Sequence, residues 1–518
     1  MFGFALWDRQ KKTLTLARDR FGEKPVYYTA DNRKIAFSSE LSSLALSPEF
    51  DRTIDREALC HYFRTTNFPA PLTVYKKAKK LPPGHYLTWK EDNGTKVKCY
   101  WDWSQVYTAG MSSPFTGSSK EAVNELDRLL KRSVKLRMEA DVSLGAFLSG
   151  GIDSSVIAAL MQVQSTKPVK TFSIGFDVPG FNEAQHAKKV ANHLGTDHIE
   201  EYITGEDALA VVPKLADIFD EPFADSSQIP TYLVSNMAKK HVTVALTGDG
   251  GDELFAGYRR YEMTEALWKK MSFAPTFMRR FAAAFINMMP PSFLKVICSP
   301  LAGSAKKYSR EGHLGMKIKR LAHWLPARNI EELYKLSMSS CYTPQTLVLN
   351  THAREPYWQP TFPEFKKIME KLTFHDLINY LPGDILTKVD RCTMAVSLEG
   401  RIPLLDPEVA QFASSLPLDY KWRNNQGKWI LREVLYRYIP KQLIDRPKMG
   451  FGVPMDVWLR GPLREWAEEL LSKQSLKNQE ILNSSIVQKN WKQHLSGQSN
   501  NSSYLWSILM FQAWQNKE

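Results

Sequence analysis

The pattern of apolar and polar positions changes near Lys120, where an amphipathic helical stretch leads into alternating apolar and amphipathic segments. Apolar residues recur at helical spacing between Ala122 and Leu136. Short apolar runs then alternate with helix-length segments, which predicts an α/β fold with a doubly wound parallel sheet that binds ligands at the carboxyl ends of its strands. The predicted strands are 142–148, 171–176, 199–203 and 242–247, and the predicted helices are 154–165, 183–194, 207–219 and 228–240.

The chain on either side of this region has a different texture. Residues 1–105 are rich in β-formers between turn residues, residues 106–119 are small and polar enough for a linker, and the chain beyond Tyr261 is mostly helical. We therefore expect a β-rich layer over 1–105, a linker over 106–119, and an α/β domain over 120–518 with a mostly helical C-terminal part. The predicted N-terminal strands are 13–17, 26–29, 34–38 and 84–89.

The composition is that of a globular protein with more than one domain. The chain has 518 residues, of which 43% are hydrophobic and 24% charged, and this length exceeds what a single core supports. Five scattered cysteines without a CxxC pair argue against a disulfide framework or a zinc site and favour a cytoplasmic location. The start lacks the basic and apolar regions of a signal peptide, and no apolar run of about eighteen residues predicts a membrane span.

The net charge of +13 is concentrated in one segment. Residues 266–320 contain eleven basic residues against Glu311 alone. We expect a solvated helical insertion there, although a basic and apolar stretch can also contact anionic lipid or another subunit. The expected partners are small-molecule substrates and not nucleic acid, and the sequence leaves a homodimer open.

The most informative motif is Ser149-Gly-Gly-Ile-Asp-Ser-Ser155, which joins a predicted strand to a predicted helix. The Gly-Gly turn directs backbone N–H groups outward at the positive end of the helix dipole, the serine hydroxyls add donors, and the carboxylate can hold a divalent cation. This pattern predicts a polyphosphate cradle, with a plain helix cap as the alternative. It is not a Walker A loop, because no Gly-Lys-Ser/Thr follows the glycines. The candidate phosphate-binding residues are Ser149, Gly150, Gly151, Asp153, Ser154 and Ser155.

Three further stretches carry candidate chemistry. Thr247-Gly-Asp-Gly-Gly-Asp-Glu253 follows a predicted strand and crowds three acids at its end, which favours a bound cation or base chemistry over a merely acidic turn. The other two stretches are Leu386-Thr-Lys-Val-Asp-Arg-Cys-Thr-Met394 and Arg446-Pro-Lys-Met-Gly-Phe-Gly-Val-Pro454. In the latter, Lys448 is rigidly mounted between a proline and a glycine, as suits a cation that stabilises a developing phosphate charge.

Together these motifs resemble the synthetase domain of glutamine-dependent asparagine synthetases, a branch of the ATP-pyrophosphatase superfamily. The resemblance runs from about residue 120 to beyond 460 and includes Glu221-Pro-Phe-Ala-Asp-Ser-Ser-Gln-Ile-Pro230. Met1-Phe-Gly-Phe-Ala-Leu-Trp-Asp8 and Arg18-Asp-Arg-Phe-Gly-Glu-Lys-Pro25 resemble the later half of the family's type-2 glutamine amidotransferase domain, an Ntn-hydrolase-like fold.

The N-terminal part departs from this family in one respect. The family's glutaminase uses an N-terminal cysteine, whereas residue 2 here is Phe2 and none of the five cysteines lies near the start. We therefore expect a truncated or mis-assigned glutaminase half that does not hydrolyse glutamine, with ammonia supplied from elsewhere. The β-layers should then expose apolar surface.

The resemblance implies a two-step reaction that uses ATP and Mg²⁺. The side-chain carboxylate of aspartate attacks the α-phosphorus of ATP, pyrophosphate leaves, and ammonia then converts the β-aspartyl-adenylate to asparagine and AMP. By similarity, Asp153 and Asp252 hold Mg²⁺, and Lys448 stabilises charge on the α-phosphate. The remaining implied contacts are Thr247 and Gly248 with the nucleotide, and Phe147 and Ile174 around the adenine.

Asp249 takes the position where the family places a glutamate that deprotonates the incoming nitrogen. Aspartate is shorter by one methylene, which withdraws the carboxylate by about 1.5 Å. Either the backbone lies closer here, or Glu253 or a water shares the role. Two other interpretations stay open, namely an enzyme of the same family that amidates another carboxylate such as a sugar acid, and a non-catalytic assembly subunit.

Overall fold

The N-terminal part of the molecule is built from two antiparallel sheets. The computed structural model describes residues 1–518 except 177–183, 290–292, 295–313, 352–361, 446–451 and 518. One sheet has the order β1 (Gly3–Asp8), β2 (Thr13–Arg18), β6 (His85–Lys90), β7 (Gly94–Cys99), and the other has the order β4 (Ile35–Ser38), β3 (Tyr27–Ala30), β5 (Lys79–Lys80). The short helices α1 (Leu41–Ala45) and α2 (Arg56–Thr65) lie between β4 and β5 of the second sheet along the chain.

Strand β1 leaves apolar side chains uncovered. Phe4, Leu6 and Trp7 are all exposed, although β1 pairs along its length with β2. The expected exposure of apolar surface on the β-layers is therefore present. The strands β1, β5 and β7 were not predicted from the sequence, while the four predicted N-terminal strands are β2, β3, β4 and β6.

The centre of the molecule is a parallel sheet, as the strand–helix alternation predicts. Its strand order is β10-β9-β8-β11-β12, and every neighbouring pair is parallel. The strands are β8 (Leu144–Phe147), β9 (Lys170–Phe176), β10 (Asp197–Ile203), β11 (Val244–Leu246) and β12 (Glu399–Arg401). The sequence predicted all of these except β12, which joins the sheet from far along the chain. Strand order reverses between β8 and β11, which makes this point the topological switch of the sheet.

Successive residues of β11 enter different cores, so the sheet separates two apolar layers. Val244 and Leu246 belong to one core and Ala245 belongs to the other. The first core is formed with α4 (Ser119–Met138), α5 (Ile152–Gln162), α6 (Ala184–Leu194), α19 (Pro407–Ser415) and α21 (Trp429–Leu435). The second is formed with α2, α9 (Gln228–Lys239), α18 (Leu386–Met394) and α27 (Ser502–Gln515).

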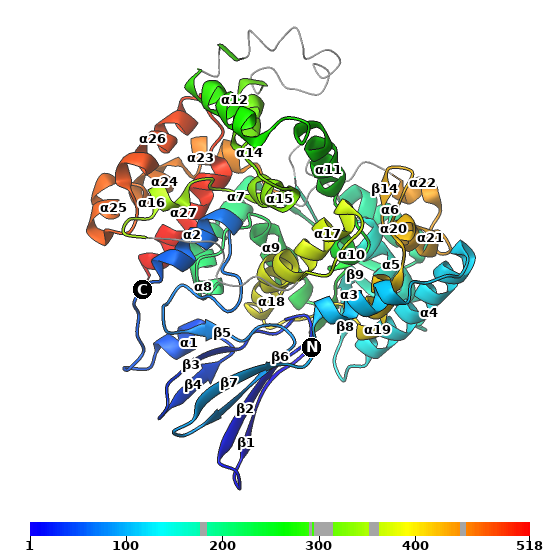
Figure 1. Ribbon diagram of the computed structural model, residues 1–518. Helices are drawn as coiled ribbons and strands as arrows, with labels where there is room; N and C mark the ends of the chain where they lie inside the picture. The colour runs from blue at the N-terminus through cyan, green and yellow to red at the C-terminus, as the bar shows by residue number, and fades with distance from the viewer. Residues whose placement is uncertain (177–183, 290–292, 295–313, 352–361, 446–451, 518) are drawn as a thin grey trace.

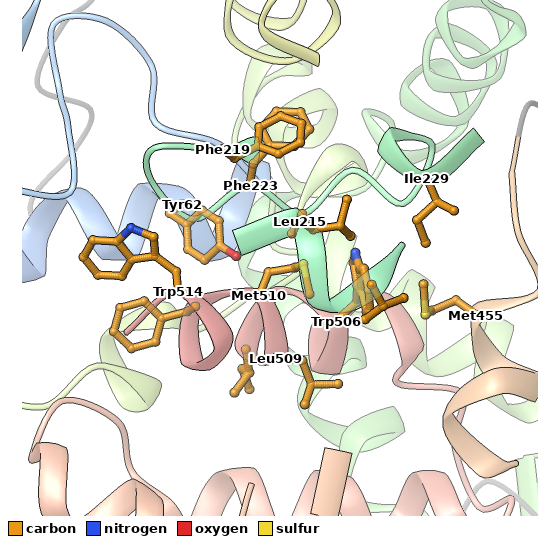
Figure 2. Close-up of a cluster of buried hydrophobic side chains, with 14 of the residues drawn as sticks. Tyr62, Leu215, Phe219, Phe223, Ile229, Met455, Trp506, Leu509, Met510 and Trp514 are labelled. Carbon is orange, nitrogen blue, oxygen red and sulfur yellow. The ribbon is translucent and has the colours of Figure 1, made fainter. Parts of the chain in front are cut away.

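Figure 2 shows how the second core ties the two ends of the chain together. Helix α27 is buried on all sides, and its Trp506, Met510 and Trp514 lie among side chains from α2, α8 (Leu215–Ile218) and α9. The hydroxyl of Tyr62 donates a hydrogen bond to the backbone oxygen of Ser507 at 2.7 Å. Helix α2 of the N-terminal part therefore shares a core with the C-terminal helix.

Two segments differ from the expected secondary structure. Helix α3 (Trp103–Ser112) runs through the first half of the expected linker, because Asp102 caps it and Trp103, Tyr107 and Gly110 form a buried face. The helix predicted over 207–219 is instead broken into α7 (Gly205–Leu209), the 3₁₀ turn η1 (Val212–Lys214) and α8. Pro213 explains the break, since proline removes a helical N–H donor.

The rest of the chain is helical, as expected beyond Tyr261. Between β11 and β12 lie α10 (Gly251–Leu254), α11 (Arg259–Met271), α12 (Thr276–Met288), α14 (Leu314–Trp324), α15 (Ile330–Met338), α16 (Pro344–Leu347), α17 (Ile368–His375) and the π-helical η3 (Asp376–Ile385). After β12 come α20 (Leu418–Lys421), the hairpin of β13 (Trp422–Arg423) and β14 (Gln426–Gly427), α22 (Lys441–Ile444), α23 (Met455–Arg460), α24 (Arg464–Leu470), α25 (Lys473–Gln479) and α26 (Ser484–Leu495). Within the described parts of the chain, no helix is both long enough and apolar enough to span a bilayer.

Candidate active site

The two motif loops lie side by side at the carboxyl end of the parallel sheet. The Ser149–Ser155 loop follows β8 and the Thr247–Glu253 loop follows β11, and these two strands are paired. The loops therefore meet at the topological switch point, where open α/β sheets bind their ligands. The prediction that both loops follow strands of a parallel sheet is confirmed, and the structure shows in addition that these strands are neighbours.

Hydrogen bonds between serines hold the first loop in shape. Ser149 Oγ lies 3.0 Å from Ser154 Oγ, and the backbone N–H of Gly151 donates to Ser149 Oγ at 3.3 Å. Gly150 has φ +69°, and a Cβ there would lie 2.8 Å from the backbone nitrogen of Ala187 in α6. Ser155 is fully buried, and among the described residues its Oγ has no hydrogen-bond partner. The loop thus places hydroxyls and backbone N–H groups at the N-terminus of α5.

The second loop packs directly against the first. A Cβ on Gly248 would lie 2.5 Å from the backbone nitrogen of Ser154, so only glycine permits this approach. Thr247 is buried at the end of β11, and its Oγ1 accepts a hydrogen bond from the backbone N–H of Asp249 at 3.5 Å. The close fit brings the carboxylates of both loops to one place.

A lysine that the sequence analysis did not identify joins those carboxylates. Lys428 forms a salt bridge with Asp153 and a second, at 2.8 Å, with Asp252 Oδ1. Its side chain is almost completely buried, and the two carboxylates raise the pKa of the ammonium group even though burial opposes this. Because both aspartates contact one ammonium group, their oxygens converge on a single cation position.

This donor set also fits Mg²⁺. Two converging carboxylates are what a Mg²⁺ ion bound to substrate phosphates requires, since it completes its shell with phosphate oxygens and water. Among the described residues there is no group of three or more His, Cys, Asp or Glu side chains that would form a metal cage. The two converging carboxylates suit a Mg²⁺ ion that also binds the phosphates of a nucleotide.

Asp249 is influenced by a second lysine. Burial raises the pKa of Asp249, and the positive charges of Lys388 and Lys428 partly offset this rise. Lys388 Nζ donates to Asp225 Oδ2 at 2.6 Å and to Ser227 Oγ at 2.8 Å. The structure thus brings together the stretches around Asp225 and Lys388, which are far apart in the sequence.

The π-helical segment adds another carboxylate to this group. Asp384 Oδ1 lies 3.9 Å from Lys388 Nζ, and burial together with the nearby charge of Asp225 raises the pKa of Asp384 well above its usual value. Asp225 shows the opposite behaviour, since the ion pair with Lys388 lowers its pKa despite burial. The two acids that flank the same ammonium group therefore have pKa values shifted in opposite directions.

Glu253, the last acid of the second loop, points into the protein. It is fully buried, and Tyr258 Oη donates to its Oε1 at 2.7 Å. Burial and the nearby charge of Asp252 raise the pKa of Glu253 to about 7. This side chain is therefore a titratable group close to neutral pH.

The two expected adenine contacts lie on neighbouring strands. Phe147 ends β8 opposite Phe172 of β9, and Ile174 follows two residues later on β9, so the side chains of Phe147 and Ile174 share a face of the sheet. Ile174 is buried and Phe147 is partly buried in the same apolar core. Lys448, expected to act on the α-phosphate, lies outside the described residues.

A cleft separates the N-terminal sheets from η3 and α18. It is open to solvent and lies between Tyr27, Phe68 and Lys80 on one side and Gly383 and Arg391 on the other. It is lined by residues of α18, the helix that carries Lys388. The cleft therefore lies between the N-terminal part and the two segments, η3 and α18, that carry Asp384 and Lys388.

Comparison with known proteins agrees with this architecture. The family model described as "Asparagine synthase" matches residues 125–516, and the model described as "Glutamine amidotransferase domain" matches residues 1–101. "Asparagine synthetase [glutamine-hydrolyzing] 1" of Bacillus subtilis (strain 168) is 33% identical over 532 residues, which cover 99% of this chain and 77% of that protein. A "Putative asparagine synthetase [glutamine-hydrolyzing]" of Mycobacterium bovis is also 33% identical, over 99% of this chain and 76% of the relative. "Amidase chyE" of Penicillium rubens is 26% identical over 92% of this chain and 73% of its own length.

Proposed function

The chain belongs to the asparagine synthase family of ATP-dependent carbon–nitrogen ligases, and from this premise we propose that it converts aspartate to asparagine through a β-aspartyl-adenylate. The observation that carries the proposal is the convergence of Asp153 and Asp252 on one cation position beside the serine loop. We also propose the division into residues 1–105, 106–119 and 120–518, which the limits of the two family matches support.

In the first step the protein binds and orients ATP and the acid. The hydroxyls of Ser149 and Ser154 and the N–H groups of the loop hold the β- and γ-phosphates, and Thr247 and Gly248 contact the nucleotide. Mg²⁺ held by Asp153 and Asp252 would neutralise phosphate charge when bound. An oxygen of the aspartate side chain forms a bond with the α-phosphorus, the bond to the bridging oxygen breaks, and pyrophosphate leaves. We propose that Lys448 stabilises the charge that develops there.

In the second step ammonia attacks the activated carbonyl carbon. The carbon–nitrogen bond forms, the bond to the AMP oxygen breaks, and the nitrogen loses a proton. We propose Asp249 as the acceptor of this proton, since its raised pKa makes it a stronger base than an exposed aspartate. The adjacent cluster of Asp225, Asp384 and Lys388 supports binding of a zwitterionic substrate close to Asp249.

We propose that residues 1–101 do not themselves hydrolyse glutamine and that the synthetase part receives its nitrogen as ammonia. Residues 1–101 contain two cysteines, Cys60 and Cys99, and burial raises the pKa of both thiols. A nucleophilic cysteine instead needs a lowered pKa. Within residues 1–101, therefore, neither thiol has the activation that glutamine hydrolysis requires.

The proposal is tested by ATP–pyrophosphate exchange and by asparagine formation with the 518-residue chain. Exchange should depend on aspartate, and asparagine should form with ammonium but much more slowly with an equal concentration of glutamine. Asp153→Ala should abolish exchange, while Asp217→Ala, at an exposed position, should not. Retained exchange in Asp153→Ala would refute the metal assignment, and equal yields from glutamine and ammonium would refute the assigned nitrogen source.

A second candidate is amidation of a different carboxylic acid. The similarity to a protein named an amidase favours keeping this candidate. Exchange that fails with aspartate but proceeds with another acid, such as a uronic acid, would select it. Absence of ATP binding would instead indicate a non-catalytic subunit.

A further inference from the structure

Helix α12 presents a continuous apolar stripe to solvent. Phe277, Phe281 and Phe285 follow one another at helical spacing and are all exposed, and Met288 continues the row with 84% of its surface exposed. With about 100° between successive residues, these four side chains occupy an arc of roughly 80° on the helix. Phe273, in the turn before α12, is 91% exposed. Large apolar residues gathered in this way usually mark a contact surface.

The opposite face of α12 fixes this orientation. Arg279 and Ala283 are the buried residues of the helix. Arg279 Nη1 donates to the backbone oxygens of Leu325 at 2.8 Å and Ala327 at 2.6 Å, beyond the end of α14. The helix is therefore anchored through a buried guanidinium group, and the phenylalanines must face outward. Figure 1 shows α12 at the periphery of the molecule, next to α14.

Exposed basic side chains lie on α12, on the preceding helix α11 and on α14, which packs against α12, and we call them the border of the stripe. Lys270 in the last turn of α11 and Arg280 on α12 are exposed, as are Lys317 and Arg320 on α14. Among the described residues, none of these four forms a salt bridge with an acid, although Arg280 helps to lower the pKa of Glu332. At the far end of α12, Lys319 Nζ donates to the backbone oxygen of Asn287 at 3.5 Å. The apolar stripe is thus accompanied by basic side chains on its own helix and on neighbouring helices.

We propose that α12 binds the surface of an anionic lipid bilayer, with the phenylalanine stripe inserted at the level of the headgroups. An amphipathic helix with phenylalanines on one face and lysine or arginine at its border has the composition of an interfacial helix. Thirteen residues span about 20 Å, which is too short to cross a bilayer, so the helix lies on the membrane.

The charge pattern disfavours a second copy of this chain as the occupant. Two identical stripes packed together would bring two sets of lysines and arginines next to each other, and such like-charge contacts are unfavourable. Anionic headgroups, by contrast, neutralise the border, and each basic residue near the surface strengthens binding by several-fold.

The test is co-sedimentation of the full chain with vesicles of phosphatidylglycerol and phosphatidylcholine at a 30:70 ratio, compared with pure phosphatidylcholine. The wild-type protein should bind the anionic vesicles at least about tenfold more strongly. Phe277→Ser/Phe281→Ser/Phe285→Ser should lower this binding by at least about tenfold, whereas Leu46→Ser/Val97→Ser/Tyr202→Ser, at exposed positions elsewhere, should not. Circular dichroism melts establish that each variant is folded.

A second pair of variants leaves the apolar stripe intact. Lys270→Glu/Arg280→Glu should lower binding to anionic vesicles by about tenfold or more and weaken its salt dependence, while Lys96→Glu/Lys98→Glu on β7 carries the same charge change and should not. Equal binding to both vesicle types, or binding unaffected by both stripe and border variants, would overturn the proposal. A dimer in analytical ultracentrifugation that the phenylalanine variant dissociates would assign the stripe to a second copy and would also overturn it.

Discussion

The carboxyl group of Asp249 has a raised pKa because it is withdrawn from water at the end of β11, with Lys388 and Lys428 only partly opposing the shift. In the proposed reaction it acts after adenylation, as the proton acceptor. Asp249→Asn should therefore leave aspartate-dependent ATP–pyrophosphate exchange within about threefold of wild type and slow asparagine formation by about 10²-fold or more. Equal losses in the two assays would show that Asp249 serves the first step instead.

Lys428 holds two carboxylates that would otherwise repel each other. Removing one partner of a buried ion pair leaves uncompensated charge, which costs about 3 kcal/mol. Lys428→Met should lower the free energy of unfolding, measured by urea denaturation, by about this amount. The exposed Lys96→Met serves as the control and should change it by less than about 0.5 kcal/mol.

Adding Mg²⁺ to Lys428→Met distinguishes the loss of the lysine's positive charge from the loss of its packing contacts. If Asp153 and Asp252 converge on one cation position, Mg²⁺ should recover part of the stability of Lys428→Met. No recovery at millimolar Mg²⁺ would contradict the view that these two carboxylates can share a divalent ion.

Glu253 should make the stability of the protein depend on pH. Its pKa is about 7 in the folded protein, against an ordinary value of 4.5, so the folded state retains the proton that the unfolded chain releases. The stabilisation is complete below pH 4.5 and is lost as the pH rises to 7, by roughly 2–3 kcal/mol. Denaturation between pH 5 and 8 should show this decline in wild type and in the exposed control Glu206→Gln, and a weaker decline in Glu253→Gln. An unchanged slope in Glu253→Gln would contradict the assignment.

At the scale of elements, the two loops function as one unit because no side chain separates them. A methyl group at Gly248 would lie 2.5 Å from the backbone nitrogen of Ser154 and would force the loops apart. Gly248→Ala should therefore lower ATP–pyrophosphate exchange by at least about tenfold, since small displacements of positioning groups are costly. Gly205→Ala, where nothing lies within 4 Å, is the matched control. Normal exchange in Gly248→Ala would show that the loops do not need this contact.

The same two loops explain how far the sequence could predict the site. Each is a continuous stretch directly after an apolar strand, so its place in a parallel sheet follows from local pattern alone. Lys428 could not be found in this way, because a lysine after a hairpin is ordinarily just solvated, and the stretch that contains Lys388 was singled out without a role for this lysine. Both are brought to the loops by tertiary packing, from 275 and 163 residues away from their aspartate partners.

The secondary structure shows the same contrast between what local sequence pattern predicts and what tertiary packing decides. The central strands were predicted because short strand-length runs alternate with helix-length segments, whereas β12 has only Glu399–Arg401 and exists through pairing with β11. The segment over 207–219 has the apolar content of a helix, but Pro213 divides it. Long-range pairing and a single backbone constraint thus account for these differences.

At the scale of the whole molecule, the N-terminal sheets are joined to the parallel-sheet region by buried polar contacts. Arg391 of α18 pairs with Asp220 at 2.7 Å, and Asp220 Oδ2 accepts a hydrogen bond from the backbone N–H of Leu41 at 3.0 Å. Glu221 forms a salt bridge with Lys80 and accepts a hydrogen bond from the N–H of Val74 at 3.1 Å. The stretch that begins with Glu221 therefore has a structural role besides its link to Lys388 through Asp225.

The ion pair between Lys24 and Asp390 allows this attachment to be measured, because its two residues come from the two parts of the molecule. Lys24 Nζ lies 2.7 Å from Asp390 Oδ1, and Asp390 is buried. Lys24→Met would leave that carboxylate without its ammonium partner and should lower the free energy of unfolding by about 1.5–3 kcal/mol. Lys11→Met, which removes an exposed lysine 3.9 Å from Asp8, should have an effect below about 0.5 kcal/mol.

If the sheets contribute to a single cooperative unit, calorimetry of Lys24→Met will show one transition at lower temperature, because α2 and α27 still share a core. Two separate transitions would mean that this ion pair, and not the shared core, couples the N-terminal part to the rest of the protein.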